Sequence, residues 1–452
     1  MATSINTTAL EPLCRREAAA FLAAHPRCQE MATATAEHFL YGVPMHWMSD
    51  WSTPISLFVQ EARGAHFTCV DGLEYSDFCL GDTGAMFGHS PAPVARAIAA
   101  QAARGLTVML PSADAVAVGQ LLSECFELPF WQMATTATDA NRFVLRWARA
   151  VTARKHIVVF NGCYHGTVDD TFIDLVNGSP ARRDSLLGQA YDITEYTRVV
   201  EFNDLAALEL ALADNQVACV ITEPALTNIG MVLPAPGYLE GVRQLTRQHG
   251  TLLVVDETHT ISTGPGGAAR AWGIDADFLV VGKPIAGGLP CAVYGFTAEM
   301  AERMQRAKNN APHGHSGIGT TLSGNALSLA AVRANLAEVM TPAAYQHMLP
   351  LAERLASGLR TAIHRHGLAW CVTQLGARCE FQFRPQPPQN GTEAEAAFDP
   401  PLERAIHLYL LNRGVMITPF HNMTLVCPDT SSDDVARLLA TFDFCLDEIV
   451  AA

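Results

Sequence analysis

The amino-acid sequence predicts an α/β protein built on a mostly parallel β-sheet. The main observation is a set of short apolar runs bounded by turn residues, at 156–160, 217–222, 251–255 and 278–281. These runs are too short for buried helices, and unbroken apolar character is typical of strands covered on both faces. Helical patterns such as 139–152 and 237–249 separate them, and strands alternating with helices give a parallel sheet.

The two ends of the chain differ from this centre. Helical patterns cover residues 325–338, 344–366 and 401–412, and a Pro/Gln/Gly-rich loop covers 384–390. We therefore predict a large central domain and a smaller α+β domain built from both termini. The predicted segments are 1–70, which contributes to the smaller domain and carries a substrate-pocket loop, 71–330 for the large domain, and 331–452 for the rest of the smaller domain.

The composition excludes several functional classes. The 452 residues carry a formal net charge of −15 and no basic cluster, which argues against a nucleic-acid partner. The N-terminus lacks the pattern of a secretory signal, and no run approaches the roughly 18 apolar residues of a membrane span. Twelve cysteines are scattered singly, so we expect reduced thiols in a cytoplasmic protein and no metal site.

Polar side chains follow each predicted strand. The first strand runs into Tyr164-His165-Gly166, and the second ends at Glu223-Pro224. The third ends at Asp256-Glu257-Thr258-His259 and the fourth at Gly282-Lys283. Ligands of parallel α/β sheets bind outside the carboxyl ends of the strands. We therefore expect an aromatic ring, carboxylates and a lysine to meet at one edge of the sheet.

Lysine is scarce in this chain, and one lysine stands in an unusual place. Lys155, Lys283 and Lys308 are the only three, against 27 arginines. Lys283 alone ends a buried apolar strand, where an amine is costly unless it is neutral, paired or covalently used. Desolvation suits Schiff-base chemistry. The alternative is a lysine that extends from a domain edge into solvent.

Two hydroxyl-rich turns precede predicted helices. Residues 135–139 (Thr-Thr-Ala-Thr-Asp) and 320–325 (Thr-Thr-Leu-Ser-Gly-Asn) both offer hydroxyl and backbone N–H donors. A helix N-terminus with such donors can bind a phosphate, although ordinary N-capping explains the same residues. The role of Asp256 also has alternatives, since a lone aspartate can cap a helix or bind a metal. No metal-binding spacing such as H-E-x-x-H accompanies it.

In this order, the segments resemble the class III (fold type I) aminotransferases. The likeness is to the branch that contains glutamate-1-semialdehyde aminomutase and β-amino-acid transaminases, and it runs from about Gly64 to the C-terminus. Residues 71–77 resemble the family's D-G-x-x-Y-x-D segment and residues 88–89 its G-H. The remaining motifs are the phosphate loop S-G-T-E-A-N at 136–141, Y-H-G at 164–166, E-P at 223–224, D-E at 256–257, G-K at 282–283 and G-T-x-S-G-N-P ending at 326.

The resemblance implies pyridoxal 5'-phosphate (PLP) as the cofactor, joined to Lys283 as a Schiff base (an internal aldimine). It implies three catalytic residues: Lys283, Asp256 on the pyridine nitrogen, and Tyr164 stacked on the ring. The implied cofactor-binding set is Thr136, Ala137, Thr138, Tyr164, Glu223, Asp256, Thr258, Lys283 and Thr321. Thr321 would reach across from the partner subunit, so the family pattern implies a homodimer with shared active sites.

Four positions depart from the family pattern. Ala137 stands where the family has Gly, so we expect a backbone that avoids positive φ or bears strain. Asp139 replaces Glu, Thr258 replaces an apolar residue behind the ring, and Ala326 replaces Pro. None of these changes removes a catalytic group. They suggest a distant subgroup whose substrate cannot be borrowed from better-known members.

The implied reaction is a ping-pong transamination between an amine or amino acid and a keto acid or aldehyde. Lys283 would form the aldimine and then act as general base and acid. The same residues would serve an intramolecular aminomutase of the glutamate-1-semialdehyde type. A racemase or decarboxylase of the same fold is a further alternative. A non-catalytic PLP-fold protein is a separate class, and it would have no chemical need for the lysine.

The substrate pocket is less clearly marked. Trp47 and Trp51 lie where relatives place a substrate-contacting loop, although such a cluster more often serves packing. No arginine occurs between Arg27 and Arg63 to bind a substrate carboxylate, so a carboxylate would be bound by Arg378, by His421 or by neither. We therefore expect substrates that are amines, or amino acids whose carboxylate is remote from the reacting carbon.

Overall fold

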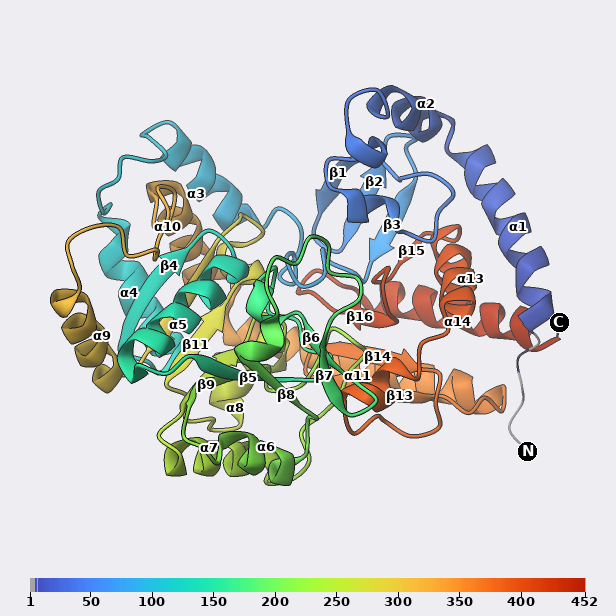
Figure 1. Cartoon of the computed structure of the whole chain (residues 1–452). Helices are drawn as coiled ribbons and strands as arrows, with labels where there is room; N and C mark the ends of the chain where they lie inside the picture. The colour runs from blue at the N-terminus through green and yellow to red at the C-terminus, as the bar shows by residue number, and fades with distance from the viewer. Residues whose placement is uncertain (1–4, 6, 452) are drawn as a thin grey trace. The chain divides into compact units, whose positions relative to one another are not determined.

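The computed structural model describes residue 5 and residues 7–451, which form two compact units that we describe separately (Figure 1). Unit 1 combines both ends of the chain, as Met1–Pro91, Ala343–Pro387 and Ala397–Ala452. Unit 2 is the central part, Ala92–Pro342 with Pro388–Ala396. The domain boundaries that we predict after residues 70 and 330 stay a prediction.

Unit 2 is an α/β unit. Its strands are β4 (Phe130–Ala134), β5 (His156–Phe160), β6 (Ile173–Val176), β7 (Ser179–Arg182), β8 (Thr197–Val200), β9 (Val217–Thr222), β10 (Leu252–Asp256), β11 (Phe278–Val281) and β12 (Ala292–Phe296). Its helices are α3 (Ala92–Ala102), α4 (Asp114–Phe126), α5 (Ala137–Thr152), α6 (Leu205–Leu212), α7 (Tyr238–Gln248), α8 (Gly267–Ala271), α9 (Ala298–Asn310), α10 (Ala326–Ala334) and α12 (Gly391–Glu395).

Seven strands form the central sheet in the order β4-β12-β11-β10-β9-β5-β8. The pairs β10–β11, β10–β9, β5–β9 and β5–β8 are parallel, whereas β12 runs antiparallel to both of its neighbours. The predicted mostly parallel sheet is therefore confirmed. Consecutive βα units place the carboxyl ends of β9, β10 and β11 next to one another, and the loops that follow these strands carry the motif residues.

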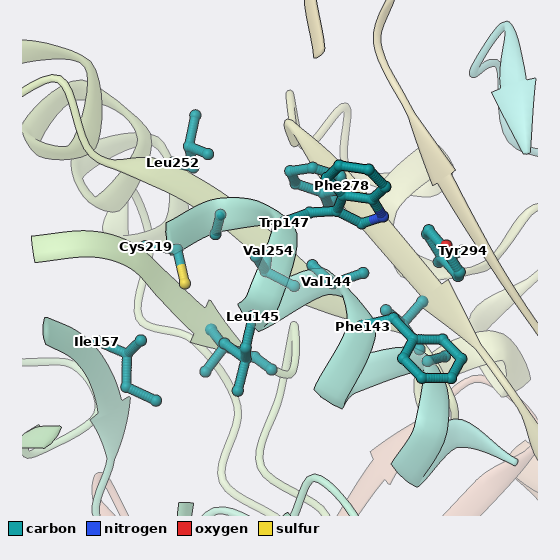
Figure 2. Packing of buried hydrophobic residues seen from close by; sticks show 14 of the residues in the cluster. Phe143, Val144, Leu145, Trp147, Ile157, Cys219, Leu252, Val254, Phe278 and Tyr294 are labelled. Carbon is teal, nitrogen blue, oxygen red and sulfur yellow. The ribbon is translucent and has the colours of Figure 1, made fainter. Parts of the chain in front are cut away.

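The predicted strands form because their side chains are buried on both faces. All residues of β9, β10 and β11 are buried. Helix α5 packs on β9, β11 and β12, and Figure 2 shows its Phe143, Val144 and Trp147 within the same cluster as Val254 and Tyr294 of the sheet. This cluster holds α5 against the sheet, and the N-cap Thr136 marks where the helix begins. The first turn of α5 is consequently held next to the strand ends.

One predicted helix differs in detail from the observed one. The pattern at 325–338 continues α10 only to Ala334, after which Asn335–Val339 forms a π-helical turn. Asn335 is buried there, and its amide donates to the carbonyls of Pro284 (2.9 Å) and Ile285 (3.0 Å). A π-turn inside a helix frequently marks a functional region. Here it supports the turn that follows β11.

Unit 1 is an α+β unit, as predicted for the smaller domain. Its strands are β1 (Val59–Arg63), β2 (His66–Cys69), β3 (Glu74–Asp77), β13 (Cys371–Leu375), β14 (Arg378–Gln382), β15 (Val415–Met416) and β16 (Met423–Leu425). They form a sheet β1-β2-β3-β15 and a sheet β13-β14-β16. Its helices are α1 (Thr7–Ala24), α2 (Pro26–Thr35), α11 (Pro342–Arg365), α13 (Pro400–Leu411) and α14 (Ser432–Ala451). No helix within residues 7–451 has both the length and the apolar character to cross a membrane.

Candidate active site

Lys283 begins the turn that follows β11 and adopts an unusual backbone conformation. Its φ angle is +42°, in the left-handed region that a residue with a Cβ rarely occupies. Such conformations cost about 1–3 kcal/mol and persist where the surroundings hold them. The two hydrogen bonds from Asn335 to the next two residues provide that hold. The fold thus keeps a lysine side chain partly accessible in a strained, well-supported turn.

Asp256 ends β10, directly beside β11, and is almost fully buried. Its carboxylate accepts hydrogen bonds from the Asn141 amide (2.8 Å) and the Thr258 backbone N–H (3.1 Å), and it pairs with His165 Nδ1 (3.0 Å). Burial alone would raise the pKa of Asp256, but the His165 hydrogen bond and charge outweigh it and hold that pKa below its usual value. Asp256 is therefore an ionised, rigidly oriented carboxylate at this edge.

His165 is the buried partner of that carboxylate. Burial by itself lowers the pKa of an imidazole, but the hydrogen bond to Asp256 raises the pKa of His165 above its usual range. The other ring nitrogen, Nε2, has no hydrogen-bond partner among the described residues. The pair is consequently an imidazolium against a carboxylate, which fixes the negative charge of Asp256.

The first turn of α5 lies against the loops that carry the other motifs. Thr136 caps the helix by accepting from the Asp139 N–H (3.2 Å), and Thr138 Oγ1 accepts from the Thr167 N–H (3.1 Å). A Cβ added at Gly282 would come within 2.7 Å of Ala137 Cβ, so the residue before Lys283 touches this turn. Backbone N–H groups at a helix start favour an anion.

Ala137 needs no unusual conformation at the start of α5. It is the first helical residue and is not among the residues with positive φ. The first of the two expected alternatives is therefore confirmed: the backbone at Ala137 avoids positive φ. Gly166 makes the corresponding close approach from the other side: a Cβ there would lie 2.9 Å from Thr138 Cα.

Three further predicted residues lie at the same strand ends. Tyr164 is 37% exposed, and its ring meets Phe172 edge-on at a centroid distance of 6.5 Å. Glu223 is buried at the end of β9, where its carboxylate accepts from the Thr227 hydroxyl. Thr258 is buried after β10, and its hydroxyl oxygen has no hydrogen-bond partner among the described residues. A buried hydroxyl of this kind is suited to a ligand.

Residues that the motif comparison did not single out also belong to this edge. Asn141 and His165 lie inside recognised motifs, yet their shared contact with Asp256 depends on the packing of α5 against the sheet. His259 is the more informative omission, because its Nε2 lies against Lys283 Nζ and its Nδ1 lies 2.7 Å from Thr227 Oγ1. The only sequence signal for His259 is its place three residues after Asp256.

The remaining predicted residues lie elsewhere in the chain. Thr321 is exposed in the turn before α10, and its role toward a partner subunit stays a prediction. Trp47, Trp51, Arg378 and His421 all belong to unit 1. Trp47 is 44% exposed and meets Phe420 edge-on, with ring centroids 6.5 Å apart.

The two candidate carboxylate ligands are buried within unit 1. Arg378 donates to Thr83 Oγ1 at 2.6 Å. His421 Nδ1 lies 2.9 Å from a Glu380 carboxylate oxygen. Burial lowers the pKa of His421, but the Glu380 charge and hydrogen bond outweigh it and raise that pKa above its usual value. These contacts give both cations a partner within the unit, and a role in substrate binding stays a prediction.

Sequence comparisons place these observations among known proteins. A family model described as aminotransferase class-III matches residues 47–442. The chain is 33% identical over 423 residues to the glutamate-1-semialdehyde 2,1-aminomutase 2 of Brevibacillus brevis, which covers 90% of this chain and 96% of that protein. It is 32% identical over 374 residues to the glutamate-1-semialdehyde 2,1-aminomutase of Bordetella avium, which covers 80% of this chain and 84% of that protein.

Solved structures give a matching result. A glutamate-1-semialdehyde-aminomutase from Pseudomonas aeruginosa PAO1 is 48% identical, with a TM-score of 0.97 over 98% of this chain and 99% of that one. The same values hold for a lysine-to-alanine form of that enzyme in complex with PMP. A β-phenylalanine aminotransferase from Variovorax paradoxus, at 24% identity, shares the fold with a TM-score of 0.84 over 97% of this chain and 96% of that one.

Proposed function

The chain belongs to the class-III aminotransferases, and from this premise we propose that it transfers an amino group between an amine or amino acid and a keto acid or aldehyde. The cofactor is pyridoxal 5'-phosphate. The observation that carries the proposal is the convergence at one sheet edge of a strained lysine, an ionised buried carboxylate and a helix N-terminus. These three features match the aldehyde, the pyridine nitrogen and the phosphate of the cofactor.

The residues at this edge fit PLP. The first turn of α5, with Thr136, Ala137 and Thr138, offers backbone and hydroxyl donors that would hold the phosphate. Asp256 would accept a hydrogen bond from the protonated pyridine nitrogen, a role that needs the ionised form held by His165. The Thr258 hydroxyl, which has no partner among the described residues, and the exposed Tyr164 ring would provide further polar and aromatic contacts. Lys283 would supply the amine that binds the cofactor aldehyde.

When bound, PLP supplies an electron sink for the pair released at the substrate carbon. The charge at the ring nitrogen and the proton transfers depend on residues of this chain. Asp256 keeps a negative charge at the ring nitrogen because three hydrogen-bond donors fix it in an ionised state. The Lys283 amine would take a proton from the substrate carbon and donate it to another atom of the reacting group. A positioned acid–base group of this kind contributes roughly 10²–10⁴-fold in rate.

The substrates are small amines, amino acids and their carbonyl partners. We propose that Trp47 and Trp51 contribute an apolar wall and that Arg378 or His421 meets a remote carboxylate, as the sequence suggests. A donor screen tests this proposal: amines, β-amino acids and α-amino acids are offered to the holoenzyme with pyruvate or 2-oxoglutarate as acceptor. A strict preference for α-amino acids would contradict it.

A second candidate is an intramolecular aminomutase, and the relatives named glutamate-1-semialdehyde 2,1-aminomutase support it. The two functions separate in one experiment. The holoenzyme, converted to its amine form, is incubated with glutamate-1-semialdehyde and no keto acid. An aminomutase would move the amino group from C2 to C1 over many turnovers. A transaminase would stop after one equivalent per site and resume when an external donor and acceptor are added.

A homodimer and a cytoplasmic location complete the proposal. In a homodimer, Thr321 would contribute to the partner's phosphate site. Sedimentation of the holoenzyme tests the oligomeric state, and a monomer with full activity would contradict shared sites. All twelve cysteines are free in the structure, which supports a reducing compartment.

A further inference from the structure

A line of buried hydrogen bonds leads away from Lys283. His259 Nε2 lies against Lys283 Nζ, and His259 Nδ1 lies 2.7 Å from Thr227 Oγ1. The Thr227 hydroxyl donates in turn to a Glu223 carboxylate oxygen. Exposed fractions of 7% for His259, 1% for Thr227 and 4% for Glu223 exclude bulk water from these contacts. The line therefore joins the candidate cofactor lysine to a buried carboxylate through one imidazole.

The position of this line follows from the sheet. Strands β11, β10 and β9 are neighbours in that order. Each contributes at its carboxyl end: Lys283 follows β11, His259 lies three residues after β10, and Glu223 follows β9. Thr227 lies in the loop after β9. Three adjacent parallel strands thus set the spacing, so the line belongs to the rigid part of the unit and not to a surface loop.

The donor and acceptor directions fix which nitrogen of His259 carries hydrogen. The Thr227 hydroxyl has a single hydrogen, which it donates to a Glu223 carboxylate oxygen. Thr227 Oγ1 can then only accept from His259, which requires hydrogen on Nδ1. In the neutral imidazole the other nitrogen, Nε2, must carry the lone pair. That lone pair faces Lys283 Nζ.

We propose that His259 is a further catalytic residue, which takes a proton from Lys283 Nζ and returns it, with Thr227 and Glu223 as positioning residues. When a proton moves from the Lys283 ammonium to His259 Nε2, the N–H bond on Nζ breaks and an N–H bond on Nε2 forms. The Nζ lone pair becomes available to attack a carbonyl carbon, and Nδ1 keeps its hydrogen bond to Thr227. No electrons are gained or lost, and the reverse transfer restores the starting state.

This inference rests on the proposed function of Lys283, but it can be tested without the cofactor. Trace acetylation of the full-length chain, freed of PLP, measures the reactivity of each lysine amine by mass spectrometry. Lys155 and Lys308 lie outside this line and serve as internal references in the same molecule. The ratio of Lys283 labelling to theirs reports how readily Nζ loses its proton, independently of turnover.

The variants separate proton transfer from packing. His259→Gln keeps a polar side chain without a titrating nitrogen, and we expect the Lys283 ratio to fall at least tenfold, a modest share of the roughly 10²–10⁴-fold typical of acid–base groups. Thr227→Val should give an intermediate fall, and Thr227→Ser should restore a ratio within about twofold of the wild type. His249→Gln is the matched control, since His249 precedes β10 at the opposite end of that strand; it should leave the ratio unchanged.

Imidazole ¹⁵N NMR of the holoenzyme provides the second readout. The signal pair lost in His259→Gln identifies His259, and we expect hydrogen on Nδ1 and none on Nε2 in the neutral form. An unchanged labelling ratio in a folded His259→Gln chain, or hydrogen on Nε2, would overturn the proposal. If that variant does not fold, equal ratios in Thr227→Val and Thr227→Ser would overturn it instead. Borohydride fixation of PLP on Lys283 tests the proposed function separately, so either can fail alone.

Discussion

Replacing Asp256 with Asn tests the charge arrangement at the site most sharply. The side chain keeps its size, but in the wild type both carboxylate oxygens accept hydrogen bonds, from Asn141, His165 and the Thr258 backbone N–H. An amide has only one acceptor oxygen, and its NH₂ group would face a donor. The variant therefore breaks a buried ion pair and also leaves a polar clash, for which no rotamer of Asn compensates.

The size of the effect follows from the burial of the pair. Removing one partner of a buried ion pair costs about 3–5 kcal/mol. For a unit of this size each kcal/mol lowers the melting temperature by about 2–4 °C, which gives a fall of roughly 6–20 °C. Release of the His165 proton limits the loss, because burial alone favours the neutral imidazole.

The pH dependence of this loss has a defined sign. The lowered pKa of Asp256 contributes stability that is present above the unfolded value of 3.8 and disappears as the pH falls through the folded value. The raised pKa of His165 contributes stability that is fully present below the unfolded value of 6.5 and disappears as the pH rises through the folded value. The difference between wild type and Asp256→Asn should therefore be largest between those two unfolded values.

Calorimetry of the full-length chain freed of PLP is the appropriate assay, because a ligand that binds the folded state masks the change. Glu257→Gln is the matched control: the neighbouring carboxyl is equally buried, but burial raises its pKa to about 7. Below pH 7 this carboxyl is mostly protonated and neutral. An amide keeps one acceptor oxygen for the Ala269 N–H and presents a donor to the Thr260 hydroxyl, which can accept as well as donate, so the substitution costs little. A melting temperature for Asp256→Asn within about 2 °C of the control would refute the reasoning.

Three further predictions follow from the contacts around the site. Gly282→Ala should weaken PLP binding about 5- to 150-fold, because overpacking against α5 costs about 1–3 kcal/mol. A fluorescence titration measures the affinity, and Gly119→Ala, which lies in open space on α4, should bind PLP like the wild type. Because the pKa of Glu257 is raised, wild-type melting temperature should fall as the pH rises from 4.5 to about 7, and a Glu257→Gln chain with the same slope would contradict this. Asn335→Ala should lower the free energy of unfolding by about 2–6 kcal/mol, because two buried hydrogen bonds are lost. The N-cap variant Asn325→Ala should lower it by about 1 kcal/mol. Similar unfolding midpoints of the two variants in urea would contradict the inference that Asn335 supports the Lys283 turn.

Much of the central sheet could be predicted because burial on both faces leaves a clear pattern. The bounds of β5, β9 and β11 coincide with the predicted runs, and β10 is shifted by one residue. The order of Asp256 and Lys283 at adjacent strand ends followed from the same pattern. The antiparallel strand β12 was not predicted, because Gly295 interrupts its short apolar run and nothing within five residues encodes the direction of a strand.

The rest of the site depends on contacts between segments distant in sequence. No local pattern predicts that His259 meets Lys283, because their contact requires β10 and β11 to pair in register. The tautomer of His259 depends in turn on Thr227, 32 residues away. The N-terminal helices α1 and α2 also escaped prediction: α1 contains Pro12 and has no acidic residue in its first turn, so the usual start signals are missing.

The site of cofactor attachment tests the account most directly. The holoenzyme is reduced with borohydride, digested, and its PLP-bearing peptide is identified by mass spectrometry, alongside Lys283→Ala and a chain in which Lys155 and Lys308 are both changed to Arg. We predict one label per chain on Lys283, its loss in Lys283→Ala, and its retention in the double variant. A label on Lys155 or Lys308, or a wild type that fixes no PLP at all, would contradict the central claim that Lys283 is the cofactor lysine.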